Sequence, residues 1–222
     1  MKYSLLSPSD ACPLTLDTNT IYRFLSLSEN NRKVTWIRED QMYPDHPERF
    51  QDPISQVLCI EGLTGCSYCL VEWSGIVLIG VTYRRINRRG EVLDGMLGWN
   101  DLSWSLECDD RDGRYHVNHN RETTVLHVRP SGSNRVALYV DHPAGSLSFY
   151  RVVEDTLTHV FTFQNTFTKP LYAGFGIYPD STVFLCEDIK AVRTDRQTVS
   201  TDKQAESTDR QAVMTDRQCI VS

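Results

Sequence analysis

Apolar residues gather in short runs along most of the chain, and turn residues separate these runs. Residues 77–83 form a continuous apolar run rich in β-branched side chains, which is typical of a strand buried on both faces. Residues 135–140 and 146–150 flank a turn that contains Pro and Gly, so they predict a hairpin. Residues 158–163 alternate with a period of two, and residues 181–186 close the series. Little helical periodicity lies between these runs, so the pattern predicts an all-β sandwich or barrel.

The C-terminal part of the chain has a different pattern. The sequence Thr-Asp-Arg-Gln at residue 194 returns with a period of seven residues, and aromatic residues are absent from residues 188–222. A coiled coil needs apolar residues at two separated positions of each heptad, but here they are adjacent, as in residues 212–214. We interpret residues 188–222 as a solvated, largely disordered tail, with a weak or conditional helix as the alternative. The expected organisation is therefore an N-terminal extension (1–10), one domain (11–187) and the tail.

Composition supports a single folded domain and limits the classes of partner that it can bind. The chain has 222 residues with 40% hydrophobic content, enough for one sizeable core. The formal net charge of −6 is mild and scattered, which argues against nucleic-acid binding. The one basic run, residues 84–89, is interpreted as an exposed turn because a glycine follows it. No window is long and apolar enough for a membrane span, and residues 1–10 lack the apolar run of a signal peptide.

The seven cysteines carry no recognisable metal or catalytic pattern. Their number is odd and their spacing irregular, which favours free thiols in a reducing compartment, and hence a cytoplasmic location. Cys66 and Cys69 have the spacing of half a zinc site, but residues three apart on a strand face opposite sides. His116 and His119 are expected to diverge for the same reason. We therefore expect neither a metal nor a cofactor, and no enzyme activity.

Several motifs follow one another along the expected domain. The first half carries LTLDTNT at residues 14–20 and YPDHPERF at residues 43–50. The second half carries LGWNDLSWSL at residues 97–106, DHPAGSLSFY at residues 141–150 and PLYAGFG at residues 170–176. In this order the motifs resemble the B30.2 (PRY-SPRY) family, in the form common among fish tripartite-motif ligases, NLR-type immune receptors and stonustoxin-like toxins. The resemblance implies a bent two-sheet antiparallel sandwich of the concanavalin-like jelly-roll type. It divides the domain into a PRY part (about 11–60) and a SPRY part (about 61–187).

The resemblance also implies a protein-recognition role, with a binding face made by loops on one side of the sandwich. The residues of this chain that match that face are mainly polar and of mixed charge: Arg84, Arg85, Glu107, Asp109, His142, Ile177, Tyr178 and Asp180. The implied partner is a protein, bound by a monomer, in innate immunity or in substrate choice by a ubiquitin ligase. Two alternatives stay open: a lectin-like binder of glycans or small ligands, and a fragment of a larger toxin or receptor.

One departure from the family pattern concerns the core. Cys69 stands where the family's WEVE strand has a tryptophan. A large-to-small change in a core costs roughly 3–5 kcal/mol when the site does not repack. We therefore expect a domain that is less stable than its relatives.

Overall fold

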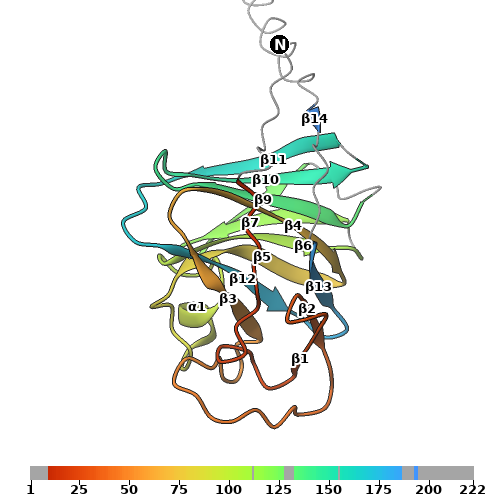
Figure 1. Cartoon of the computed structure of the whole chain (residues 1–222), viewed down its shortest axis with the longest axis vertical. Helices are drawn as coiled ribbons and strands as arrows, with labels where there is room; N and C mark the ends of the chain where they lie inside the picture. Colours follow the sequence, from red (N-terminus) through yellow and green to blue (C-terminus); the bar gives the residue numbers. More distant parts are fainter. Residues whose placement is uncertain (1–9, 112, 128–132, 155, 187–192, 195–222) are drawn as a thin grey trace, which may run out of the picture.

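The protein folds as two stacked β-sheets with almost no helix. The computed structural model describes residues 10–111, 113–127, 133–154, 156–186 and 193–194. The eight-stranded sheet has the order β1 (Leu25–Ser28), β2 (Lys33–Trp36), β13 (Thr182–Cys186), β4 (Cys66–Ser74), β9 (Arg135–Asp141), β10 (Ser146–Val153), β11 (Thr156–Gln164) and β14 (Arg193–Thr194). The six-stranded sheet has the order β3 (Gln56–Leu63), β12 (Leu171–Ile177), β5 (Ile76–Tyr83), β6 (Ser103–Asp109), β7 (Arg114–His119) and β8 (Glu122–Leu126). The sheets lie face to face in Figure 1.

The predicted all-β sandwich is confirmed, and so are its main strands. The run at 77–83 is β5, whose residues after the first are all buried. The predicted hairpin is β9 and β10, in which Asp141 pairs with Ser146. The neighbouring strands of both sheets are antiparallel, except that β14 runs parallel to β11. That short pairing lies within the range assigned to the tail, and the other residues of the tail lie outside the described residues.

A β-bulge in β11 explains why apolar side chains of this strand point to both faces of the sheet. The register shifts between Phe149 and Tyr150 of β10, so β11 contributes one more residue than its partner there. Phe161 and Phe163 pack against the main core, whereas Leu157 belongs to a small second cluster. The simple alternation expected for residues 158–163 is thus interrupted, and side chains from one strand cover both faces of the sheet.

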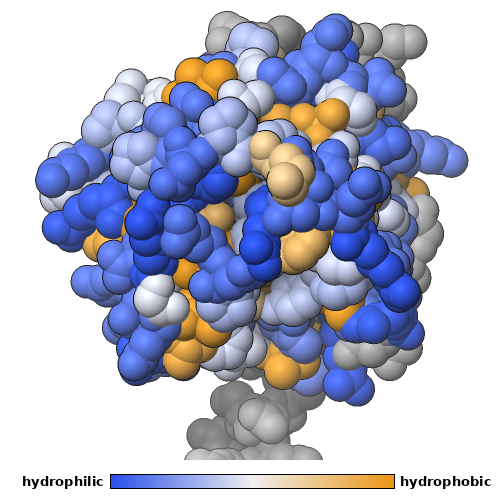
Figure 2. Space-filling view, turned by 90° about the horizontal axis from the view of Figure 1, so that it is seen from below, coloured by the Kyte–Doolittle hydropathy of each residue, from blue (hydrophilic) through white to orange (hydrophobic). Residues whose placement is uncertain are grey.

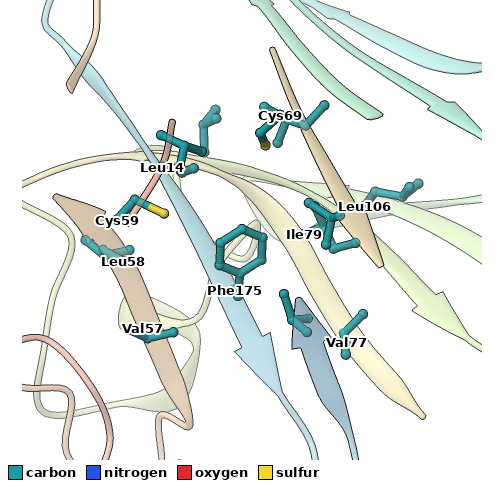
Figure 3. Close-up of a cluster of buried hydrophobic side chains, with 14 of the residues drawn as sticks. Leu14, Val57, Leu58, Cys59, Cys69, Val77, Ile79, Leu106 and Phe175 are labelled. Atoms are coloured by element: carbon teal, nitrogen blue, oxygen red, sulfur yellow. The ribbon is translucent and has the colours of Figure 1, made fainter. Parts of the chain in front are cut away.

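The inner faces of the two sheets enclose the main hydrophobic core. Phe175 of β12 lies at the centre of the part drawn in Figure 3, and it forms a row with Ile79 of β5 and Leu106 of β6, because these residues pair across neighbouring strands. All three side chains are fully buried. Burying a large apolar side chain stabilises a fold by about 1.5–3 kcal/mol, so this region supplies much of the stability of the sandwich.

Cys69 lies at one end of this core, beside a cavity of about 210 Å³. The side chain of Cys69 is 7% exposed and belongs to the main core. The cavity, which we call the thiol cavity, lies between the N-terminal segment, β4 and the end of β13, and Cys12, Leu14, Leu185 and Cys186 also line it. The cysteine therefore fits without a clash and leaves unfilled space next to it. Its effect on stability stays a prediction.

Substituting Cys69→Trp should raise the free energy of unfolding by about 1–2 kcal/mol, because the indole fills the thiol cavity and buries additional apolar area. Urea unfolding of the two proteins measures the difference. A lower unfolding midpoint for the tryptophan variant would show that the cavity cannot accept the ring and that the site has repacked around the thiol.

One small helix matters for the surface of the six-stranded sheet. The single-turn α1 (Val92–Gly95) lies in the long connection between β5 and β6. Gln56 of β3 ties this connection to the sheet, because its amide nitrogen donates to Gly95 O (2.9 Å) and its amide oxygen accepts from Leu97 N (2.6 Å). Within the described ranges, no helix has the length and apolar character needed to cross a membrane.

Candidate binding site

The eight residues expected at the binding face lie at two opposite ends of β5. Glu107 pairs with Leu78 and Asp109 with Ile76, near the start of β5, and the backbone N–H of Tyr178 donates to Ile76 O (3.2 Å). Ile177 pairs with Val77 at the same end, and Asp180 precedes Ser181, whose hydroxyl accepts from Ile76 N–H (2.8 Å). Arg84 and Arg85 follow the other end of β5, and His142 lies on that side, where it contacts Phe167 and Lys169 O. An eight-residue strand is roughly 23 Å long, so the structure does not bring the two groups together.

Arg84 is held inside the domain by two carboxylates. Its guanidinium donates to Asp17 Oδ2 (2.8 Å) and to both carboxylate oxygens of Glu48, and it lies over the ring of Tyr172 at 5.2 Å. The hydrogen bond from Arg84 lowers the pKa of Glu48, and that bond raises the pKa of Arg84. Asp17 is buried, and Arg84 lies 2.8 Å from its carboxylate as a cationic partner.

The interpretation of residues 84–89 as an exposed turn was therefore only half right. Arg85 and Arg89 are exposed, but Arg84 and Arg88 are half-buried. Arg88 donates to the backbone oxygens of Glu48 and Arg84 and lies 4.6 Å from the ring of Phe50. The basic side chains alternate between solvent and the residues around Glu48 and Phe50, because those residues pack against this connection.

Arg84→Ala should lower the free energy of unfolding by about 1–3 kcal/mol, because it leaves the buried carboxylate of Asp17 without its cationic partner. Arg85→Ala is the matched control, and we expect a change within about 0.5 kcal/mol for this exposed neighbour. Equal effects of the two substitutions in urea unfolding would contradict a structural role for Arg84.

The ion pair with Glu48 should also contribute a pH-dependent part of the stability. Because the folded state lowers the pKa of Glu48, its contribution is present above the ordinary value of about 4.3 and is lost as pH falls through the lower, folded pKa. The difference in unfolding free energy between the protein and Glu48→Gln should therefore be largest near neutral pH and shrink towards about pH 3. Urea titrations over this range measure it, and a difference that grows on acidification would contradict the assignment.

Ile177 is not available to a partner through its side chain. It is 1% exposed and belongs to the main core, where it pairs with Val77. The next residue, Tyr178, lies on the other side of the backbone and is half-buried at the surface. The family resemblance implied that both residues belong to the face, but strand alternation directs only Tyr178 outward.

A largely apolar groove lies beside Tyr178, and we call it the aromatic groove. Its volume is about 450 Å³, and it runs between the N-terminal segment, α1 and the loop after β12. The end of the molecule that lies lowest in Figure 1 carries several separate hydrophobic patches among hydrophilic residues (Figure 2). The residues that line the groove come from six segments of the chain: Tyr22, Phe24, Trp36, Pro53, Ile54, Ser55, Gln56, Leu78, Val92, Met96, Gly176, Ile177, Tyr178 and Pro179.

The floor of the groove is a row of residues across the outer face of the six-stranded sheet. Gln56 pairs with Gly176, Gly176 with Leu78, and Leu78 with Glu107. Directly paired residues point to the same face, so these positions form one line. Gly176 leaves space above the sheet at this point, and a Cβ there would lie only 2.9 Å from Leu78 Cδ1. Any larger residue at this position would fill the groove or displace the leucine.

Tyr22, Ser55 and Gln56, three polar residues that line the groove, have hydrogen-bond partners within the protein. The hydroxyl of Tyr22 donates to Asp52, which also pairs with Arg23 at 2.7 Å. The hydroxyl of Ser55 donates to Ile177 O (2.8 Å). Burial, with Glu107 nearby, raises the pKa of Tyr178 to about 12, so its phenol stays protonated at neutral pH. The groove thus offers mainly apolar surface, with the phenol as a polar group at its edge.

Sequence reasoning missed most of this groove. Tyr22, Phe24 and Trp36 lie in or near short strands of the N-terminal segment, and Val92 and Met96 lie around α1. Val92 is apolar, but only the structure shows that its side chain is 37% exposed and so available to a partner. Single-sequence patterns could not show that these segments meet.

Metal ligation finds no support among the residues that the structure describes, since no group of three or more His, Cys, Asp or Glu residues there is arranged to hold an ion. Cys66 is exposed and Cys69 buried, as expected for opposite faces of β4. His119 stacks on Trp104 at 4.7 Å, whereas His116 lies 3.8 Å from Glu107 on the outer face. The two histidines therefore diverge, as the strand spacing predicted.

A two-sheet sandwich with a groove lined by loops and strand ends defines a binding module of the all-β class. Sequence models of two families match the chain: PRY, described as the SPRY-associated domain, over residues 14–63, and SPRY over residues 70–187. The chain belongs to the PRY-SPRY (B30.2) family. The groove is built by both parts, because its aromatic walls come from PRY residues and its floor includes SPRY strands.

Relatives of known sequence include toxin subunits and tripartite-motif proteins. Stonustoxin subunit alpha from Synanceia horrida is 40% identical over 170 residues, covering 76% of this chain and 24% of the toxin subunit. Tripartite motif-containing protein 16 from Mus musculus is 37% identical over 173 residues, covering 75% of this chain and 30% of that protein. The chain therefore spans about a quarter of the length of the toxin subunit.

Solved structures confirm the fold. The stonustoxin structure matches 80% of this chain and 29% of its own, with a TM-score of 0.74 and 36% identity. The crystal structure of the TRIM65 PSpry domain matches 81% of this chain and 92% of its own, with a TM-score of 0.71 and 26% identity.

Proposed function

We propose that this chain is a protein-recognition module that binds an apolar segment of its partner in the aromatic groove. The observation that supports this most directly is the combination of aromatic walls, an apolar floor and polar side chains that already have partners inside the protein. A binding energy hot spot forms where an anchoring side chain enters a pocket from which water is excluded. Membership of the PRY-SPRY family supports binding, as opposed to catalysis, as the activity.

Four of the residues expected at the binding face keep a place in this proposal. Tyr178 lines the groove, Glu107 and Asp109 lie near it on β6, and Asp180 lies in the loop after β12. They would provide the polar rim that surrounds an apolar anchor in protein interfaces. Arg84, Arg85 and His142 would need a second contact at the far end of β5.

We further propose that the module selects targets for a larger system of the tripartite-motif or NLR-like type in the cytoplasm. Similarity to tripartite-motif proteins supports this setting. Similarity to stonustoxin subunits is compatible with a second setting, a recognition module within a longer toxin or receptor chain. In both settings the module acts by binding. A lectin-like role has less support, because the groove lining contains Trp36 but no asparagine to hydrogen-bond a sugar.

Val92→Asp tests the groove directly. Peptides selected on the purified protein from a random phage-displayed library should bind the Val92→Asp variant at least about tenfold more weakly, because a charge at the groove wall opposes desolvation. Val125→Asp is the matched control, since this exposed valine lies on the edge strand β8 and should leave the Kd unchanged.

Isothermal titration gives both Kd values, and circular dichroism checks that each variant is folded. Peptides that bind both variants with the affinity of the parent protein would overturn the assignment of the groove. Loss of binding in both variants would place the contact on the open sheet face between these two positions, and so would also contradict it.

A further inference from the structure

The N-terminal segment closes one end of the sandwich by pairing with both sheets. In this strap (residues 11–17), the N–H of Cys12 donates to Tyr68 O of β4 at 3.1 Å, within a parallel bridge. Further along, Leu16 forms an antiparallel bridge with Cys59 of β3. The strap thus joins the eight-stranded sheet to the six-stranded sheet, and a thiol lies at each point of contact.

The register of the first contact places two thiols side by side. Ala11 is the bridge partner of Tyr68, so Cys12 lies next to Cys69 on the neighbouring strand. Laterally adjacent residues of a parallel pair point to the same face. Both side chains pack against the main core, and both line the thiol cavity of about 210 Å³. Figure 3 shows Cys69 and Leu14 at the same end of the core.

The spacing of adjacent strands suits a covalent bond between these two residues. Neighbouring strands lie about 4.8 Å apart, and the two Cα atoms of a disulfide are usually about 4.4–6.8 Å apart. Two other thiols of this end are less well placed. Cys66 lies three residues from Cys69 and is exposed, and Cys186 pairs with Leu70, which points to the opposite face. In this structure, Cys12 and Cys69 are both free.

We propose that Cys12 and Cys69 are a redox pair whose disulfide locks the strap onto β4. The oxidant is a small disulfide of the glutathione type. The thiolate of half-exposed Cys12 attacks one sulfur of oxidised glutathione, the S–S bond breaks, and one glutathione thiol leaves with the proton from Cys12. The thiolate of Cys69 then attacks the Cys12 sulfur of the mixed disulfide and releases the second glutathione thiol with its own proton. Two electrons pass from the protein thiols to the glutathione.

The burial of the two groups sets the order and the pace of this reaction. Cys12 is partly exposed and reacts first, whereas Cys69 is reached only through the thiol cavity. Burial raises the pKa of both thiols, for Cys69 to about 12, so the thiolate fraction is small and oxidation is slow. The resulting loop connects the start of the PRY part to the first strand of the SPRY part. Its closure restricts the unfolded chain and should raise the Tm by roughly 5–10 °C.

The test uses the full chain, incubated for hours with oxidised glutathione and then alkylated. We expect Cys12 and Cys69 to become resistant to alkylation without gaining a glutathione, the Tm to rise, and reduction by dithiothreitol to reverse both changes. Mass spectrometry of a tryptic digest without reduction should show the Cys12 peptide linked to the peptide that spans residues 50–84. That peptide also contains Cys59 and Cys66, so single substitutions assign the partner.

Cys12→Ser should abolish both the link and the Tm shift, and Cys69→Ala should abolish the link while leaving Cys12 open to a glutathione adduct. Cys66→Ser is the matched control on the same strand and should behave as the parent protein. A link that survives Cys69→Ala, a Tm shift that survives Cys12→Ser, or accumulation of the glutathione adduct alone in the parent protein would each overturn the pairing.

Discussion

The packing of the PRY segment against both sheets is the constraint on which the rest of the structure depends. Its strands β1 and β2 extend the eight-stranded sheet beside β13. Its preceding residues hydrogen-bond to β3 of the six-stranded sheet, as where Asp17 N–H donates to Leu58 O (2.8 Å). The ion pairs of Arg84 then clamp the segment to the connection that follows β5. Without this docking, both sheets would lose an edge and the aromatic groove would lose a wall.

The groove is a consequence of that docking. Its floor is the outer face of the six-stranded sheet, where Gly176 leaves the space that a side chain would fill. Its walls come from segments far apart in the sequence, including the PRY aromatic residues and α1. A rigid sheet that carries variable loops lets recognition change without a change in the core. This division suits a family whose members occur in chains as different as toxin subunits and tripartite-motif proteins.

The proposed Cys12–Cys69 disulfide would make the packing of the strap against β4 depend on the redox state. Cys12 and Cys69 lie just before the ranges that match PRY and SPRY, where the strap meets β4, so a bond between them would act on the packing of the PRY segment that supports the groove wall. The cavity beside Cys69 is also lined by Cys12, so this position can affect the redox chemistry of the strap as well as the packing of the core. A cysteine fills less of the core than an aromatic ring, but it adds a thiol beside Cys12 of the strap.

The sequence by itself determined the all-β class, the main strands and the family. Runs such as residues 77–83 and the hairpin at residues 135–150 depend on local patterns of apolar and turn residues, and these survive in any arrangement of the strands. Only the tertiary structure decided that Arg84 is paired with buried Asp17, that Ile177 faces the core, and that the eight expected site residues divide between two ends of β5. Alternation predicts that a strand has two faces, but the identity of its neighbours depends on contacts between distant segments. The groove and the pair of thiols are made of such contacts, and for that reason the sequence pattern did not reveal them.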